Sequence, residues 1–132
     1  MPWKILVVDD DVDTCANLSD ILTDFGHEVC TAHNARDALQ RADEQRFDIV
    51  LLDLQMPGLD GVDLYRELKR PAPTAVAILM TGFADSEMER RATRTGVSRM
   101  LRKPLDIEML MRLIQCVAEQ PMLLRRGDEV AY

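Results

Sequence analysis

The sequence predicts an α/β fold in which five parallel strands form one sheet with helices on both faces. Short apolar runs recur along the chain, and longer segments with helical periodicity separate them. The runs at 49–52 and 75–80 are nearly all apolar, as strands buried on both faces of a sheet must be. A length of 132 residues suffices for one domain with its own core and is short for two.

Five strands and five helices are expected along the chain. The predicted strands span residues 4–8, 28–32, 48–52, 75–80 and 97–101. The predicted helices lie near residues 12–25, 35–45, 61–69, 86–95 and 107–119. The expected N-caps are Asn34, Asp85 and Asp106, and the glycines that close helices are Gly26 and Gly96. One face of the first helix is expected to carry Cys15, Leu18, Leu22 and Phe25.

Right-handed crossovers leave few topologies for such a chain. We expect the doubly wound, flavodoxin-like strand order 2-1-3-4-5, in which ligands bind at the carboxyl ends of the strands beside the switch between strands 1 and 3. The run at 28–32 contains Glu28 and Thr31 and suits an edge strand.

Polar residues follow four of the five predicted strands. They are Asp9 and Asp10 after the first strand, Asp53 after the third, Thr81 after the fourth and Lys103 after the fifth. These four strands are contiguous in the expected order, so their carboxyl ends share one rim and the polar residues should converge there. The remaining strand ends at Ala32 and offers no chemistry.

These residue types favour phosphoryl transfer assisted by a metal ion. Neighbouring carboxylates repel by about 4 kcal/mol per pair at about 4 Å if the effective dielectric constant is about 20. Mg²⁺, a hard cation that prefers oxygen ligands, would relieve that repulsion. Asp53 could then act as a nucleophile toward phosphorus, while Lys103 and Thr81 stabilise phosphoryl oxygens.

Each of these residues alone has a plainer interpretation. Acids at the start of a helix can simply cap it, and we prefer that interpretation for Asp11 and Asp13. Thr81 alone could be a turn residue, Lys103 a solvated lysine and Asp53 the cap of a turn. The combination at one rim favours a site.

Composition excludes several function classes. A formal net charge of −7 argues against nucleic-acid binding by this chain alone, because phosphate contacts need a basic surface. No segment is long enough for a membrane span, and the N-terminus does not begin a signal peptide. Cys15, Cys30 and Cys116 lack metal-site and disulfide spacing, so we expect reduced thiols and a cytoplasmic protein without a membrane partner.

The motifs together resemble the receiver domain of two-component response regulators, in the chemotaxis-regulator-like superfamily. The matching segments are Val7–Asp10, Leu52–Gly61, Met80–Gly82 and Lys103–Pro104. They occur in the right order on the expected strands and cover about residues 4–119. The resemblance implies a receiver domain over residues 1–119, followed by a tail or the start of a linker over 120–132.

The resemblance implies a role for each acid. Asp53 would take a phosphoryl group from a phosphohistidine on a sensor histidine kinase or phosphotransfer protein. Asp10 and Asp53 would bind Mg²⁺ directly, with the backbone carbonyl of Gln55 as a third protein ligand. Asp9 would support the metal through water.

The resemblance also assigns the remaining rim residues. Thr81 would follow the phosphoryl group and draw its loop inward, and Lys103 would pair with that group. The Lys103–Pro104 peptide bond would be cis. Such a domain promotes its own phosphorylation and dephosphorylation without being a turnover enzyme.

Two residues depart from the usual family pattern. Met100 stands where receivers usually carry a switching Tyr or Phe; it could still exchange between inward and outward packing but lacks a hydroxyl. Phe83 stands two residues after Thr81, on the path of the hydrolytic water, and we expect it to shield the acyl phosphate and lengthen its lifetime.

The usual output face of the family is helix 4, strand 5 and helix 5. In this chain the last helix carries a second apolar stripe, and the preceding segment is rich in arginine. The stripe is Met109, Leu113 and Cys116, and the arginines are Arg90, Arg91, Arg94, Arg99 and Arg102. This surface is interpreted either as a contact for a partner or a second copy, or as a longer ordinary helix that the tail at 121–124 covers beside solvated arginines.

Three other functions suit the sequence less well. A flavodoxin-like electron carrier needs a phosphate-binding loop where this chain has Asp9, Asp10 and Asp11, so it is rejected. An aspartate-based phosphohydrolase needs a second acid at the position of Gln55. A phosphorylation-independent interaction module with the receiver fold is disfavoured by the intact set of rim residues.

Overall fold

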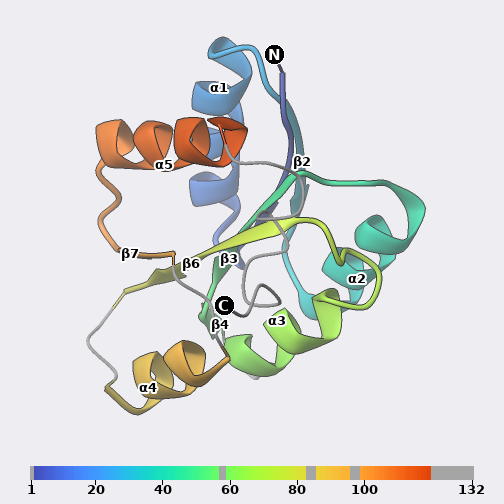
Figure 1. Ribbon diagram of the computed structural model, residues 1–132, viewed down its shortest axis with the longest axis vertical. Coiled ribbons are helices and arrows are strands. Elements are labelled where there is room, and N and C mark those ends of the chain that lie inside the picture. Colours follow the sequence, from blue (N-terminus) through green and yellow to red (C-terminus); the bar gives the residue numbers. More distant parts are fainter. Residues whose placement is uncertain (1, 57–58, 83–85, 96–98, 120–132) are drawn as a thin grey trace.

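The computed structural model describes residues 2–56, 59–82, 86–95 and 99–119 (Figure 1). Its central sheet is parallel and contains β1 (Lys4–Val8), β2 (Glu28–Ala32), β3 (Ile49–Asp53), β6 (Val76–Thr81) and β7 (Met100–Arg102). The strand order is β2-β1-β3-β6-β7, so the predicted order 2-1-3-4-5 is confirmed with β6 and β7 as the fourth and fifth strands.

Helices cover both faces of this sheet (Figure 1). One face packs against α1 (Val12–Asp24) and α5 (Ile107–Glu119), and the other packs against α2 (Ala35–Glu44), α3 (Gly61–Leu68) and α4 (Ser86–Arg94). Alternation along each strand divides the core in two. In β1, Ile5 and Val7 join the layer beneath α1 and α5, whereas Leu6 and Val8 join the layer beneath α2 and α3.

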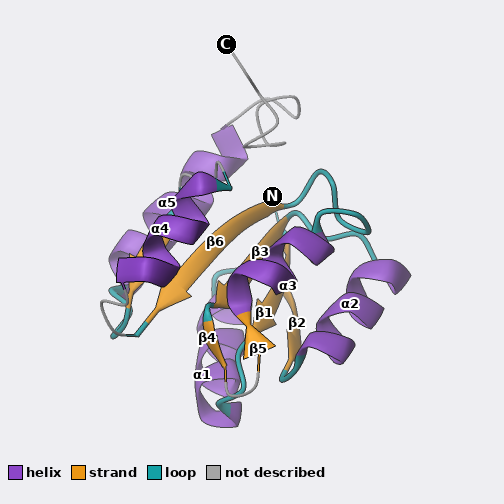
Figure 2. Ribbon diagram, turned by 90° about the horizontal axis from the view of Figure 1, so that it is seen from below, coloured by secondary structure: helices purple, strands orange, loops and turns teal. Residues whose placement is uncertain are grey.

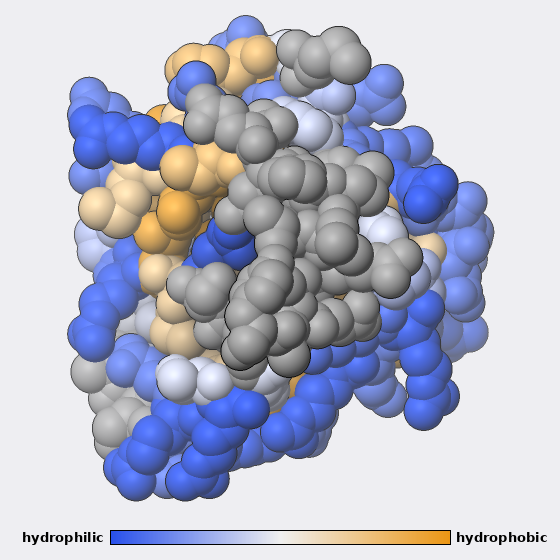
Figure 3. All heavy atoms as spheres, in the orientation of Figure 1, coloured by the Kyte–Doolittle hydropathy of each residue, from blue (hydrophilic) through white to orange (hydrophobic). Residues whose placement is uncertain are grey.

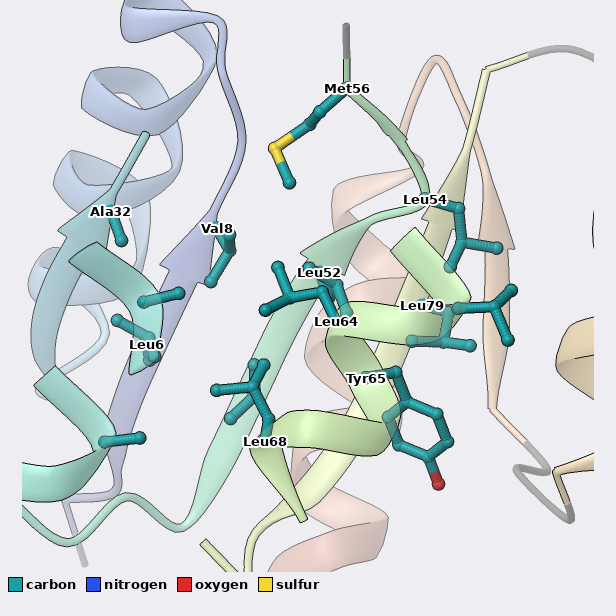
Figure 4. Close-up of a cluster of buried hydrophobic side chains, with 14 of the residues drawn as sticks. Leu6, Val8, Ala32, Leu52, Leu54, Met56, Leu64, Tyr65, Leu68 and Leu79 are labelled. Atoms are coloured by element: carbon teal, nitrogen blue, oxygen red, sulfur yellow. The ribbon is translucent and has the colours of Figure 1, made fainter. Parts of the chain in front are cut away.

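The second layer is drawn in Figure 4. Leu52 of β3 and Leu79 of β6 lie next to Leu64 and Leu68 of α3, and all four side chains are buried (Figure 4). Burying a side chain of this size stabilises the fold by about 1.5–3 kcal/mol. This packing holds β3 and β6 rigidly, and with them the polar residues at their ends.

The predicted helix caps are partly confirmed. Asn34 accepts a hydrogen bond from the backbone N–H of Asp37 at 2.8 Å and begins α2, and Asp106 accepts one from Met109 at 3.2 Å at the start of α5. Gly26 follows α1 with a φ of +93°, a conformation that favours glycine. Asp85 and Gly96 lie outside the described residues.

The expectation that Phe25 joins the apolar face of the first helix is wrong. Cys15, Leu18 and Leu22 are buried, but Phe25 is 63% exposed. The helix ends at Asp24, and Phe25 is its C-cap with a φ of −82° and a ψ of 3°. Helical periodicity would direct the Phe25 ring toward the core, but the backbone is no longer helical at this residue.

A short hairpin follows β3 in addition to the predicted strands. Its antiparallel strands are β4 (Gln55–Met56) and β5 (Leu59–Asp60), with Gln55 opposite Asp60 (Figure 2). Asp60 then caps α3 by accepting from the backbone N–H of Val62 at 2.9 Å. The hairpin thus joins the end of β3 to the start of α3.

Gly61 allows this junction to be tight. A Cβ atom at Gly61 would lie 2.4 Å from Cα and 2.6 Å from the carbonyl oxygen of Leu54. Both clashes are with backbone, so they can be relieved only by moving the segment that follows Asp53. Glycine is required at this position because the Leu54 backbone approaches it closely, and not because of its φ angle.

We therefore expect Gly61→Ala to lower the free energy of unfolding by at least about 1–3 kcal/mol, the usual cost of overpacking. Urea unfolding measures the change, and the exposed residue Glu67 of the same helix supplies the control. Glu67→Ala should stay within about 0.5 kcal/mol of wild type. Equal stabilities of the two variants would contradict the backbone clash.

Candidate functional site

The carboxyl ends of β1 and β3 bring three carboxylates together. Asp9, Asp10 and Asp53 each offer an oxygen atom, and these atoms all lie within 4.8 Å of one another. Asp9 is fully buried and Asp53 is 3% exposed, whereas Asp10 is open to solvent. Two buried acids beside an exposed one form a cluster that could hold a metal ion on its open side.

Lys103 neutralises the two buried acids. Its Nζ donates to Asp9 Oδ2 at 2.8 Å and to Asp53 Oδ2 at 3.1 Å. The backbone N–H of Lys103 donates to the carbonyl of Thr81 at 2.8 Å, which anchors the residue to the end of β6. The Lys103–Pro104 bond is cis, as expected.

The buried carboxylates are held in the same way. Asp9 Oδ1 accepts from the backbone N–H of Asp11 at 3.0 Å, and Asp53 Oδ1 accepts from that of Gln55 at 2.9 Å. In each case one oxygen binds the chain two residues onward, while the other binds Lys103. Such turns are typical of aspartate where a strand gives way to a loop.

Burial and pairing act in opposite directions on the pKa values. Burial raises the pKa of Asp53 and outweighs its hydrogen bonds to Gln55 and Lys103. Burial acts to lower the pKa of Lys103, but the two carboxylates prevail and raise it. The two directions differ because Lys103 pairs with two carboxylates, whereas Asp53 shares the Lys103 ammonium group with Asp9. Asp53 is therefore an incompletely compensated buried charge.

Thr81 and Gln55 complete the described rim. Thr81 is the last residue of β6 and is 1% exposed. Gln55 begins β4, and its side-chain Oε1 accepts from the backbone N–H of Gly82 at 3.1 Å. Both residues therefore lie beside the acids, whereas Phe83 is outside the described residues.

Two supporting residues were missed from the sequence. The Cys15 thiol donates to the backbone carbonyl of Asp9 at 3.3 Å, and His33 Nδ1 lies 3.2 Å from the same oxygen. Burial raises the pKa of Cys15 to about 11, so this thiol stays protonated. The sequence carries no signal for these contacts, because each depends on how an element packs over the end of β1.

The expected switch and output residues lie away from the acids. Met100 is half-buried in β7 and packs against the core layer that includes Leu79 and Ala92. In α5, Met109 is 48% exposed and Cys116 is exposed, while Leu113 is half-buried against the core. Figure 3 shows apolar atoms gathered around α5 on this face and hydrophilic ones around α4.

The arginines near this surface are partly engaged within the domain. Arg91 of α4 pairs with Asp60 and, at 3.4 Å, with Asp63 of α3. Arg102 lies 3.4 Å from Glu89. Arg91 therefore fastens α4 to the start of α3, whereas Arg90 and Arg94 of the same helix are exposed.

Comparison with known proteins gives the family. Residues 5–115 match the response regulator receiver domain. This chain belongs to that family. Like other receiver domains, it is a signalling domain of two-component response regulators and not a turnover enzyme, and such domains interact with histidine kinases or phosphotransfer proteins.

Relatives of this receiver domain differ in length. Transcriptional regulatory protein ZraR of Escherichia coli (strain K12) is 37% identical over 111 residues, which are 84% of this chain and 25% of ZraR. Protein PilH of Pseudomonas aeruginosa is 34% identical over 116 residues, covering 86% of this chain and 96% of PilH. The chain thus spans about a quarter of ZraR and nearly all of PilH.

Solved structures support the same fold. The crystal structure of a CheY-like receiver domain protein from Methanospirillum hungatei JF-1 superposes with a TM-score of 0.82 at 26% identity. The match covers 90% of this chain and 96% of that one. Within the described part of this chain, no helix is long and apolar enough to cross a membrane.

The raised pKa of Asp53 predicts a pH-dependent stability effect in Mg²⁺-free buffer. A raised pKa means that the folded protein binds the proton more tightly than the unfolded chain does, so ionised Asp53 destabilises the fold above that pKa. Asp53→Asn should therefore raise the thermal unfolding midpoint near neutral pH. The gain should vanish as the pH falls through the pKa of Asp53.

Asp20 on the exposed face of α1 offers a matched control for the loss of one negative charge. Asp20→Asn should leave the midpoint nearly unchanged at every pH. A decrease in the midpoint for Asp53→Asn near neutral pH would show that the ion pair with Lys103 outweighs burial and would overturn this prediction.

Proposed function

We propose that this domain is the phosphoacceptor of a two-component phosphorelay and that Asp53 receives the phosphoryl group. The observation that supports this most is the position of Asp53: a buried carboxylate at the end of β3, 3.1 Å from Lys103 Nζ and beside Asp9 and Asp10. The sensor histidine kinase or phosphotransfer protein would bring a phosphohistidine to the open side of this cluster.

The donor set fits Mg²⁺. The cluster consists of carboxylate oxygens, which this hard cation prefers. Its three negative charges are only partly balanced by the single positive charge of Lys103. Asp10 and Asp53 would bind the ion directly with the backbone carbonyl of Gln55, and Asp9 would support it through water. Bound Mg²⁺ would supply positive charge against the carboxylates and the phosphoryl oxygens.

The reaction needs little covalent chemistry from the domain. A carboxylate oxygen of Asp53 attacks the phosphorus of the phosphohistidine, a new O–P bond forms, and the N–P bond breaks. The electron pair of that bond stays on the imidazole nitrogen. Lys103 then shifts its hydrogen bonding toward the transferred group, and the Thr81 hydroxyl donates to it.

The consequences of phosphorylation would reach the face of α4, β7 and α5. Met100 packs beneath α4, where a change in its packing would alter this surface. The second apolar stripe of α5, in which Met109 and Cys116 are exposed, would bind the output partner or a second copy. Loss of concentration-dependent sedimentation on Leu113→Glu would support the homodimer. Phe83 remains the residue proposed to shield the acyl phosphate and lengthen its lifetime.

A cytoplasmic location and the domain limits 1–119 and 120–132 also remain predictions.

Intact-mass spectrometry after incubation with acetyl phosphate and Mg²⁺ tests the proposal. Wild type should gain one phosphoryl group, and Asp53→Asn should gain none. Chelation of Mg²⁺ should abolish the adduct on wild type. Asp43→Asn, which removes an exposed acid of α2, is the control and should be modified like wild type.

Two other outcomes would contradict this function. A phosphoryl group on both wild type and Asp53→Asn would exclude Asp53 as the acceptor. If neither acetyl phosphate nor a phosphorylated histidine kinase modified wild type, the phosphorylation-independent interaction module would be favoured. Continuous turnover of a phosphate ester would revive the phosphohydrolase.

A further inference from the structure

Gln55 joins two parts of the rim that are far apart in sequence. Its backbone N–H donates to Asp53 Oδ1 at 2.9 Å, and its side-chain Oε1 accepts from the backbone N–H of Gly82 at 3.1 Å. The first contact lies within the turn after β3, and the second crosses to the chain that leaves β6. One residue therefore contacts both the acid and the segment that leads to α4.

The absence of a side chain at Gly82 favours the second contact. A Cβ atom there would lie 3.1 Å from Gln55 Oε1, tighter than most such contacts, so the amide group would have to shift by a few tenths of an ångström.

The hairpin that contains Gln55 holds the same segment at a second point. Gln55 of β4 lies opposite Asp60 of β5, and Asp60 pairs with Arg91 of α4. The β4–β5 hairpin is therefore fastened to Gly82 on one side of the connection and to Arg91 on the other. Movement of α4 away from the hairpin would separate Arg91 from Asp60.

The contact with Gly82 is the one that phosphorylation would disturb. Asp53 lies opposite Met80 in the sheet, so Thr81 and Gly82 extend past it at the rim. A phosphoryl group on Asp53 would bring charged acceptor oxygens to this rim, and hydrogen bonds to charged acceptors are roughly twice as strong as neutral ones. The neutral amide oxygen of Gln55 would be the weaker acceptor for the Gly82 N–H.

We propose that Gln55 is a positioning residue whose side chain holds Gly82, just past β6, in its unphosphorylated place and is displaced from the Gly82 N–H by the phosphoryl group. This inference rests on the proposed function of Asp53. Breaking the contact opposes phosphorylation, so Gln55 adjusts how readily the domain enters its phosphorylated state.

Hydrogen exchange of the Gly82 amide, measured by NMR on the ¹⁵N-labelled chain, tests whether Gln55 protects it. Gln55→Met keeps the side-chain length and the backbone carbonyl but removes the acceptor. Hydrogen exchange at Gly82 should become about two- to tenfold faster in this variant without phosphate, as loss of one ordinary hydrogen bond implies. Gln55→Glu keeps an acceptor oxygen and should retain the protection. Gln40→Met on α2 is the matched control and should exchange like wild type.

The second readout is the binding of beryllofluoride, a phosphoryl mimic, in the presence of Mg²⁺. Half-saturation should need about two- to tenfold less beryllofluoride in Gln55→Met, since no contact must be broken. Unchanged Gly82 exchange together with unchanged half-saturation would overturn the inference while leaving the proposed function intact. If wild type bound no beryllofluoride and gained no phosphoryl adduct, the proposed function would fail and the displacement with it.

Discussion

The rest of the site depends on one interaction, the bridge from Lys103 to two buried carboxylates. Lys103 follows β7, yet its Nζ reaches Asp9 at the end of β1 and Asp53 at the end of β3. An uncompensated buried charge costs several kcal/mol, so neither acid would be tolerated there without a cation or a proton. The backbone hydrogen bond from Lys103 to Thr81, beside the pairing of β6 with β7, positions the lysine whose ammonium group makes this bridge.

The same bridge leaves the site short of positive charge, and this deficit supports the phosphoryl chemistry proposed for it. One lysine faces three carboxylates within 4.8 Å of one another, so a divalent cation on the open side beside Asp10 would improve the balance. Transfer of a phosphoryl group to Asp53 would then give Lys103 a more highly charged partner. Phosphorylation would then change the contacts that Asp53 and its neighbours make in the unphosphorylated domain. The hydrogen bond between Gln55 and Gly82 is one of them.

Much of this arrangement could be predicted from the sequence because it follows from backbone periodicity. Apolar runs define β1 and β3, and a parallel sheet must bring Asp9, Asp10 and Asp53 to the same rim. Side-chain contacts between elements could not be predicted in the same way. The pairing of Arg91 with Asp60 depends on where α4 packs, and Cys15 reaches the Asp9 carbonyl only because α1 folds back over β1. Phe25 is exposed because its helix ends one residue earlier than the periodicity suggests.

If Lys103 and Mg²⁺ compensate the same carboxylates, removing Lys103 should strengthen Mg²⁺ binding, and Mg²⁺ titration of the unphosphorylated domain by NMR measures this effect. Wild type should bind one Mg²⁺ at the acidic rim. Lys103→Met should bind it about tenfold more tightly or better, because removing the ammonium group abolishes a repulsion worth more than about 1.4 kcal/mol. Lys69→Met, at the end of α3, should titrate like wild type. Equal affinities in wild type and Lys103→Met, or no saturable binding by either, would contradict the account.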